Sequence, residues 1–560
     1  MIASLFKFKG GVKPASHKDE SAGNPIRTAP LPRQLIVPLR QSSGAAALAL
    51  VAPGQKVLKG QRIAAAEGSF SSAVHAPTSG TVLAIEPRAV PHPSGISAPC
   101  AIIEPDGEER RVERERFDWR AATPDALRDA LRDAGIVGLG GAAFPSHIKL
   151  KPNESGRIDT LIINGAECEP WITSDDRLMR ERAEEILRGA MIMRHIVGAG
   201  RILVGIEDNK PQAAAAMRSA AASLGESCIA IVPVPTLYPA GGEKQLIRVL
   251  TGIEIPYGKL GAHFGVQCFN VGTACSVHRA LELGEPLLSR IVTLTGNVER
   301  PGNFEVLIGT PVEELLPLAG PRADTDRYLM GGPMMGFTLP SLQVPVVKAT
   351  NCIIAASPAL FPPPPPEMPC IRCGACAQAC PAELQPMDLY WFARAKNFDK
   401  SQEYHVFDCI ECGSCAYVCP SGIPLVDYYR YAKSSIRARE REKNAADAAR
   451  ERFEFRTLRE EREKEEKAAR LAAKTAAGRQ AAAHGAPAAA SAAPPAATAA
   501  DESDKALIAA AIERTRERHE QVKPKNTEDL TPEKRAEIEE IEARHARMRE
   551  LAGTPPEEPV

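Results

Sequence analysis

Apolar and polar positions follow different periods in different parts of the chain. Between about residues 31 and 120, short apolar stretches are separated by Gly and Pro, which predicts small strands joined by turns. From 121 to 284, apolar runs of strand length alternate with amphipathic stretches of helical length. This alternation predicts a Rossmann-like α/β domain, in which a parallel sheet is covered by helices.

Local signals place elements inside this α/β region. Thr123 and Pro124 are a good N-cap and first position of a helix, and Gly135 is a good residue to end it. Before the glycine-rich segment that follows we therefore expect a helix and not a strand. The remaining expectations are strands over 160–163, 202–206 and 228–234, and helices over 177–197, 210–224 and after Gly242.

Two segments of the first region resemble each other, V-A-P-G-Q-K-V-L-K-G-Q-R-I-A and V-H-A-P-T-S-G-T-V-L-A-I. They resemble the paired hairpins of biotinyl/lipoyl-like barrels, whose cofactor is carried by a lysine at a hairpin tip. No lysine occurs between Lys59 and Lys149, so the attachment residue is missing. We therefore expect a small β barrel-sandwich domain with a structural role and no swinging arm.

The rest of the chain divides by composition. Residues 1–30 are an N-terminal extension, 285–345 predict a small α+β insert, and 346–366 contain F-P-P-P-P-P-E-M-P and predict a stiff linker. Charged helix formers and an alanine-rich tract predict a low-complexity tail, partly helical and partly disordered, over 436–560. Taken together, the fold class is a multidomain α/β protein.

Net charge and hydropathy restrict the classes of partner and the relation to a membrane that we expect for this chain. The formal net charge is -1, which gives no reason to expect nucleic acid as a partner. No uncharged apolar run of about 18 residues occurs, and the first residues lack an apolar stretch of signal-peptide length. We expect a protein that is soluble or peripheral to a membrane.

Two cysteine runs carry the most specific signal. The pattern C-x₂-C-x₂-C-x₃-C-P begins at Cys370 and again at Cys409, within a module over 367–435. In two-cluster ferredoxins, three cysteines of one run and the last cysteine of the other hold each [4Fe–4S] cubane. Paired zinc sites are the alternative, but they need only four ligands from two C-x₂-C knuckles and would leave cysteines unused. The expected ligands are Cys370, Cys373, Cys376 and Cys419 for cluster one, and Cys380, Cys409, Cys412 and Cys415 for cluster two.

Four further polar elements follow predicted strands or open predicted helices. They are G-L-G-G-A-A-F-P, N-G-A-E-C-E-P, G-G-E-K and F-N-V-G-T. The carboxyl ends of parallel strands are where open sheets bind ligands, and glycine-rich loops let amides approach a phosphate. For the second element, the alternative is a solvated turn in which Asp175 and Asp176 cap a helix.

Together the four elements resemble those of the NADH-oxidising flavoprotein subunit of respiratory complex I, where they hold FMN and dock NADH. The resemblance implies noncovalent FMN in a pocket of this chain and NAD(H) as substrate, without assigning a catalytic side chain. The implied pocket residues are Gly138, Gly140, Gly141, Lys149, Asn164, Glu167, Gly242, Glu243, Asn270 and Thr273.

The order of all the parts is similar to that of the C subunits of the Rnf, or Rsx, ion-translocating electron transport complexes. This resemblance implies a translocase and oxidoreductase subunit that is peripheral on the cytoplasmic face of the bacterial inner membrane. The complex would couple electron transfer between NAD(H) and ferredoxin-type carriers to Na⁺ or H⁺ movement. Implied partners are the integral-membrane and iron–sulfur subunits of the same complex and, indirectly, ferredoxin or another low-potential carrier.

Two positions depart from the complex I pattern. Ala166 and Lys244 stand where that family has acids. They leave a second hypothesis open, in which the chain is a non-enzymatic iron–sulfur carrier or scaffold whose α/β domain no longer binds flavin. The six cysteines outside the runs have no ligand spacing and are expected to be small buried apolar residues, with Cys168 inside the pocket element.

Overall fold

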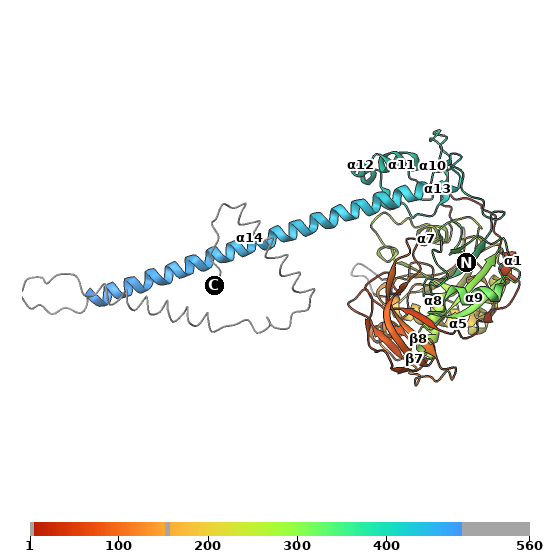
Figure 1. Cartoon of the computed structure of the whole chain (residues 1–560), viewed down its shortest axis with the longest axis horizontal. Helices are drawn as coiled ribbons and strands as arrows, with labels where there is room; N and C mark the ends of the chain where they lie inside the picture. Colours follow the sequence, from red (N-terminus) through yellow and green to blue (C-terminus); the bar gives the residue numbers. More distant parts are fainter. Residues whose placement is uncertain (1–4, 152–156, 484–560) are drawn as a thin grey trace, which may run out of the picture. The chain divides into compact units, whose positions relative to one another are not determined.

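The computed structural model describes residues 5–151 and 157–483 of the 560. The chain divides into two compact units, 1–449 and 450–560. Figure 1 shows the β domain, the α/β domain and the helices of the cysteine module within the first unit.

The β domain consists of two antiparallel sheets, with strand orders β2-β8-β7-β4 and β3-β5-β6. Its long hairpin, β7 and β8, is seen in orange in Figure 1. Apolar side chains from both sheets, including Leu35, Val82 and Ile63, form its core. The strands are β2 (Leu35–Pro38), β3 (Leu48–Ala49), β4 (Lys56–Val57), β5 (Arg62–Ala65), β6 (Val74–His75), β7 (Gly80–Ala89) and β8 (Ser97–Pro105).

A buried lysine joins the β domain to the α/β domain. Lys348 donates hydrogen bonds to the hydroxyl of Ser72 at 3.1 Å, the carbonyl of Ala73 at 2.9 Å and the carbonyl of Gly135 at 2.7 Å. Ser72 and Ala73 lie between β5 and β6, and Gly135 follows the first helix of the α/β domain. The β domain is therefore held against its neighbour by a segment next to β6.

The α/β domain is built on a fully parallel sheet of order β11-β10-β9-β12, as the alternating pattern predicted. Successive residues of β9 face opposite sides, because strand side chains alternate. Leu161 and Ile163 pack with α5 and α8, whereas Ile162 packs with α7. The elements are α2 (Pro124–Asp133), α3 (Ser146–Lys149), β9 (Thr160–Gly165), α4 (Ser174–Glu181), α5 (Ala183–Val197), β10 (Arg201–Glu207), α6 (Pro211–Leu224), β11 (Ile229–Val234), α7 (Glu243–Thr251), η1 (Gly261–Phe264), β12 (Val266–Asn270) and α8 (Val271–Glu282).

The prediction of one helix over 177–197 was wrong. The segment forms α4 and α5, which are separated at Arg182, where φ is -130° and ψ is 36°. The guanidinium of Arg182 pairs with the carboxylate of Glu305 in a strand distant in sequence. Neither Gly nor Pro occurs at the break. The contact of Arg182 with Glu305 is distant in sequence and could not be read from the local pattern.

The predicted insert is part of a larger, six-stranded sheet of order β1-β14-β13-β17-β15-β16. This corrects three expectations. A strand from the N-terminal extension joins the sheet, the sheet continues past 345, and the predicted linker over 346–366 contains a fully buried strand. The elements are α1 (Asp19–Ala22), β1 (Arg27–Thr28), β13 (Ser289–Gly296), β14 (Gly302–Leu307), α9 (Val312–Ala319), β15 (Arg327–Met330), β16 (Phe337–Thr338) and β17 (Cys352–Ala356).

The cysteine module consists of short helices followed by the start of one long helix. Tyr429, Ala432 and Ile436 are buried against the module, while Phe453, Phe455 and Leu458 of the same helix are exposed. Residues 484–560 of the predicted tail lie outside the described part of the chain. No helix in the described part is long and apolar enough to cross a membrane. The elements are α10 (Ala375–Ala379), α11 (Pro386–Arg394), α12 (Phe398–Glu403), η2 (Val406–Asp408), α13 (Ser414–Tyr417) and α14 (Leu425–Ala483).

Candidate redox sites

The two cysteine runs have the same backbone conformation. Gly374 and Gly413 occupy equivalent positions, and each has a φ of 79° at the N-cap of a short helix. Arg372 and Glu411, two residues earlier in each run, also have positive φ, 54° and 57°. A Cβ on Gly413 would lie 2.8 Å from the carbonyl oxygen of Met334, so this position also requires glycine for space. The sequence duplication is therefore a structural duplication.

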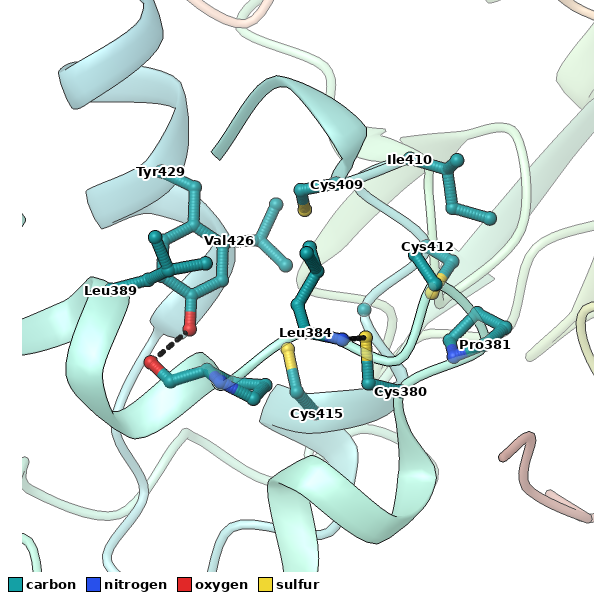
Figure 2. Close-up of a pocket in the computed structure, with 13 residues that line it drawn as sticks. Cys380, Pro381, Leu384, Leu389, Cys409, Ile410, Cys412, Cys415, Val426 and Tyr429 are labelled. Carbon is teal, nitrogen blue, oxygen red and sulfur yellow. Dashed lines mark hydrogen bonds between the residues drawn. The ribbon is translucent and has the colours of Figure 1, made fainter. Parts of the chain in front are cut away.

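Four cysteines line a single cavity in the module. Cys380 comes from the first run, and Cys409, Cys412 and Cys415 come from the second. Figure 2 shows them around a space that is otherwise lined by apolar side chains, among them Leu384, Leu389, Val426 and Tyr429. These four are the cysteines expected to hold cluster two.

The cavity has features that suit a charged sulfur ligand set. The amides of Leu384 and Glu411 each donate to a cysteine sulfur, Cys380 Sγ and Cys409 Sγ, at 3.4 Å. Such amide donors stabilise thiolates and tune the potential of a cluster. Burial raises the pKa of the Cys409 thiol to about 11, so binding of a metal group here must release protons.

The arrangement fits a polynuclear cluster better than a single ion. Within the described ranges, no group of three His, Cys, Asp or Glu side chains is placed to hold one metal ion. Four thiols around one apolar cavity instead match the ligand number of a [4Fe–4S] cubane. This chemistry disfavours the zinc alternative.

The first run lies on a more open face of the module. Cys373 is exposed, whereas Cys376 is buried. The pKa of the Cys376 thiol is raised by burial first and then by the nearby Cys373 and Cys370. Two hydrogen bonds join the segment just before Cys370 to Ser421, Met368 N to Ser421 O at 2.9 Å and Ser421 Oγ to Pro369 O at 3.0 Å. They bring the first run close to the end of the second, where Cys419 lies.

The second candidate site lies where the order in which strands are added to the parallel sheet reverses. The chain builds β10 and β11 on one side of β9 and then places β12 on the other side. Asn164 and Asn270, at the carboxyl ends of β9 and β12, are register partners across this junction. Open α/β sheets bind ligands in the crevice at such a switch point.

The glycine loop borders this crevice. The amide of Leu139 donates to Thr273 Oγ1 at 2.9 Å, and a Cβ on Gly140 would lie 3.4 Å from the Cβ of Asn270. Gly141 has a φ of 125° and no neighbouring heavy atom where its Cβ would stand. Gly140 and Gly141 are exposed, so their backbone is open to a ligand. The loop is preceded by α2, as expected, and not by a strand.

Lys149 and Glu243 are paired at the same edge. Lys149 Nζ lies 2.7 Å from Glu243 Oε2 and 5.0 Å from the ring centroid of Phe269. Gly242 is the N-cap of α7, and Asn164 Nδ2 donates to the carbonyl of the preceding Gly241 at 2.8 Å. The start of α7 is thus tied to the end of β9.

Glu167 caps a helix. Its carboxylate accepts from the amides of Asp175 at 2.6 Å and Asp176 at 3.2 Å, at the start of α4. Burial raises the pKa of Glu167 to about 8, although the Lys18 ammonium opposes this shift. The carboxylate of this predicted pocket residue is therefore hydrogen-bonded to backbone amides of the protein. Glu167 caps α4, and the two aspartates do not.

Sequence reasoning did not assign two charged side chains to the crevice, the half-buried Asp175 and the buried Arg290. Asp175 Oδ2 accepts from Asn270 Nδ2 at 2.6 Å, and Arg290 donates to the carbonyls of Leu139 and Thr350, each at 3.1 Å. Arg290 is 6% exposed, and burial lowers its pKa to about 10. One signal was available, because Arg290 directly precedes the apolar pair Ile291 and Val292 near the start of β13.

The other cysteines are mostly buried, as predicted. Cys168 Sγ accepts from the amide of Gly241 at 3.3 Å, and burial raises the pKa of this thiol to about 12. It is therefore a poor nucleophile at neutral pH. Cys100, Cys268, Cys275 and Cys352 are buried, and Cys168 and Cys228 are half-buried.

Family models match four successive parts of the chain. They are an RnfC barrel sandwich hybrid domain over residues 6–108, a Nuo51 FMN-binding domain over 131–279, an SLBB domain over 291–338 and a 4Fe-4S dicluster domain over 369–423. The two cofactor-binding domains coincide with the crevice and the cysteine module. FMN and two [4Fe–4S] clusters are therefore the cofactors of this chain.

Curated relatives match over most of the chain. A protein of Pseudomonas aeruginosa, named as the C subunit of an ion-translocating oxidoreductase complex, is 50% identical over 84% of this chain and 60% of its own length. Proteins of the same name from Salmonella gallinarum and Serratia proteamaculans are 44% and 48% identical, over 97% and 82% of this chain. The chain spans 78% of the Salmonella relative and 65% of the Serratia relative.

Proposed function

We propose a function from one established premise: this chain belongs to the family of C subunits of ion-translocating oxidoreductase complexes. In the proposal it is the NAD(H)-reactive subunit, and it passes electrons between the flavin crevice and two iron–sulfur clusters. Bound FMN supplies the chemistry that links two-electron exchange with NAD(H) to one-electron transfer.

One observation carries the proposal. Tyr238, in the segment between β11 and α7, donates from its hydroxyl to the carbonyl oxygen of Cys412 at 2.6 Å. Tyr238 also packs in one apolar cluster with Cys168, Cys412 and Ala379. Cys168 in turn accepts a bond from Gly241, at the start of α7. The crevice edge and the cluster-two loop are thus joined through a few buried residues, which supports direct electron transfer between them.

The chain's own groups have distinct roles in this proposal. The exposed amides around Gly140 and Gly141 bind the FMN phosphate. Lys149, next to Glu243 and Phe269, contributes positive charge to the crevice. Asn164 and Asn270 hold the crevice edges in place through bonds to Gly241 and Asp175. Thr273 anchors the glycine loop through the amide of Leu139, and Gly242 and Glu243 shape the rim at α7.

The eight run cysteines hold the two clusters with crossed ligation. Cys380 completes the second set, and its place beside Cys409, Cys412 and Cys415 supports this assignment. Cys419 completes the first set with Cys370, Cys373 and Cys376. The exposed position of Cys373 supports an exit of electrons toward another protein from the first cluster.

The carrier hypothesis has less support. Ala166 is buried, and its carbonyl accepts from Lys210 Nζ at 2.7 Å. Lys244 is directed to the carbonyl of Pro256 at 3.1 Å, in an exposed bond. Neither departure therefore fills the crevice, and residues 131–279 match an FMN-binding family model.

An anaerobic spectrum tests the redox role. Purified chain loaded with FMN and iron is mixed with NADH, and the flavin and cluster bands are followed. We expect both to bleach, and NAD⁺ added to the reduced chain to restore them. A flavin-loaded sample that does not respond in either direction would exclude NAD(H) reactivity and leave the carrier function.

We also propose that the chain is a peripheral subunit on the cytoplasmic face of the bacterial inner membrane, held by integral-membrane and iron–sulfur subunits of its complex. The complex couples electron transfer between NAD(H) and ferredoxin-type carriers to translocation of Na⁺ or H⁺. High-salt or alkaline washing should release the chain from membranes into the supernatant. Retention after both washes would contradict attachment through protein partners alone.

A further inference from the structure

Lys18 is a buried cation in a ring of backbone carbonyls. Its ammonium donates to the carbonyl oxygens of Glu167 at 2.8 Å, Glu169 at 2.8 Å and Ile172 at 2.5 Å. Lys18 is 8% exposed, and no salt bridge joins it to a carboxylate in the described residues. An ammonium has three donors, so the ring uses all of them. Burial lowers the pKa of Lys18, and a carbonyl partner for each proton offsets part of the cost of burying the ammonium.

The ring belongs to the β9–α4 loop, residues 166–173, which runs from the crevice to α4. Two of its residues have positive φ without being glycine, Glu167 at 49° and Trp171 at 71°. Such backbone conformations persist only when neighbouring groups hold them. Lys18 supplies three of the bonds that hold the loop in this conformation.

The loop in turn positions the crevice. Glu167 caps α4 through the amides of Asp175 and Asp176, and the Asp175 carboxylate accepts from Asn270. Asn270 is the N-cap of α8 and lies beside Gly140 of the glycine loop. A continuous series of hydrogen bonds and contacts therefore leads from Lys18 to the glycine loop.

Other residues around Lys18 strengthen the same attachment. The amide of Trp171 donates to the carbonyl of Ser16 at 2.8 Å, and the ring of His17 stacks on that of Trp171 at 4.1 Å. The hydroxyls of Ser21 and Thr173 lie 2.8 Å apart. The β9–α4 loop is thus bound along its length by a segment far from it in sequence.

The same segment reaches the cysteine module. Val12 pairs with Tyr238 through two backbone bonds, and the amide of Gly11 donates to the carbonyl of Ala379 at 3.0 Å. Gly10 has a φ of 74°, and a Cβ there would lie 2.5 Å from the carbonyl oxygen of Cys380. This close approach requires glycine at position 10.

We propose that the N-terminal strap, residues 5–26, is a positioning element of the redox sites, in which Lys18 acts as a built-in cation that shapes the β9–α4 loop for flavin binding. The proposal rests on the proposed flavin site. It goes beyond that site, because it assigns a role to a residue remote in sequence from the FMN-binding region.

The first test is Lys18→Met in the full chain, with Lys13→Met as a matched control, since Lys13 lies on the same segment and is exposed. Unpaired buried carbonyls are costly, so FMN should bind Lys18→Met about tenfold or more weakly than wild type. In Lys18→Met, amide hydrogen exchange should rise in residues 166–176 and the iron content should stay at the wild-type value. Lys13→Met should match wild type in FMN affinity, hydrogen exchange and iron content.

A second test separates the N–H donors of the Lys18 ammonium from its charge. In Lys18→Ala, methylammonium should enter the carbonyl ring and restore FMN binding and exchange protection. Tetramethylammonium has no N–H donor and should restore neither at equal ionic strength. Equal rescue by both ions would overturn the proposal.

Two further outcomes also count against the strap. Unchanged FMN affinity and unchanged exchange in Lys18→Met would exclude a positioning role. Exchange that rises throughout the chain, together with loss of iron, would show that Lys18 supports the whole fold. A wild-type chain that does not bind FMN would instead contradict the proposed function, and the exchange measurement would still test the strap.

Discussion

Asn164 and Asn270 stand opposite each other at the carboxyl ends of neighbouring parallel strands, and their side chains bind different parts of the crevice. Asn164 donates to the carbonyl of Gly241 at the start of α7, and Asn270 donates to Asp175 at the start of α4. The pair therefore connects two helix starts to the central strands. Because both side-chain amides already donate hydrogen bonds within the protein, they hold the crevice in shape.

Replacing Asn270 with alanine should weaken FMN binding and destabilise the domain. Its Oδ1 accepts from the amide of Gly272 at 2.8 Å and caps α8, and loss of a helix cap costs about 1 kcal/mol. Thr123→Ala is the matched control, because Thr123 caps α2 by accepting from the amide of Ala126. Thermal denaturation should show similar losses for both variants, but only Asn270→Ala should lower FMN content. Equal FMN content would contradict the role of Asn270.

A bulky side chain in the glycine loop should remove flavin and leave iron in place. Gly140→Leu adds a Cβ only 3.4 Å from that of Asn270 and fills space next to the exposed amides. Gly200→Leu is the matched control, because Gly200 also lacks a positive φ and its Cβ would meet only the carbonyl oxygen of Asp159, at 3.5 Å. FMN per chain and iron per chain are measured together. Retained FMN in Gly140→Leu would exclude a phosphate site at this loop.

Crossed ligation predicts that Cys380→Ser damages cluster two although Cys380 belongs to the first run. Wild type should contain about eight iron and eight acid-labile sulfide, and the variant about four of each. Cys168→Ser is the control, since Cys168 contacts the amide of Gly241 and lies outside both runs. Full iron content in Cys380→Ser would contradict the assignment.

Lys348 should make stability depend on pH. Burial lowers its pKa from 10.5 to about 7, so between these values the unfolded chain binds one more proton than the folded chain. Raising the pH through this interval therefore increases the free energy of unfolding, by about 1.4 kcal/mol for each pH unit. The Tm of wild type should rise relative to Lys348→Met between about pH 7 and pH 9. A difference in Tm that is flat or falls would show that burial does not shift this lysine.

Truncation after Ala449 should leave both cofactors in place. The buried residues of α14, such as Tyr429 and Ile436, precede this point, and the boundary between the two compact units follows it. Iron and FMN content of the truncated chain should equal those of the full chain. Loss of membrane association alone would instead indicate a docking role for the second unit.

Much of the fold could be predicted because its determinants are local. Apolar runs and helix caps predicted β9, β10, β11 and α2 to within a few residues. The break at Arg182 and the recruitment of β1 and β17 into one sheet could not be predicted, because each depends on partners distant in sequence. Short strands such as β1 are stabilised by their neighbours and not by their own composition.

By itself, the sequence determined the chemistry of the cysteine module, because the ligand spacing of a cluster is a property of a short peptide. It also determined which strand ends carry polar groups. The tertiary structure decided which of those groups remain available to a ligand. It directed Glu167 to the amides of α4, paired Lys149 with Glu243, and placed Lys18 in a ring of carbonyls more than a hundred residues away in sequence. Buried polar groups must all find partners, and only the folded chain shows which partners are within reach.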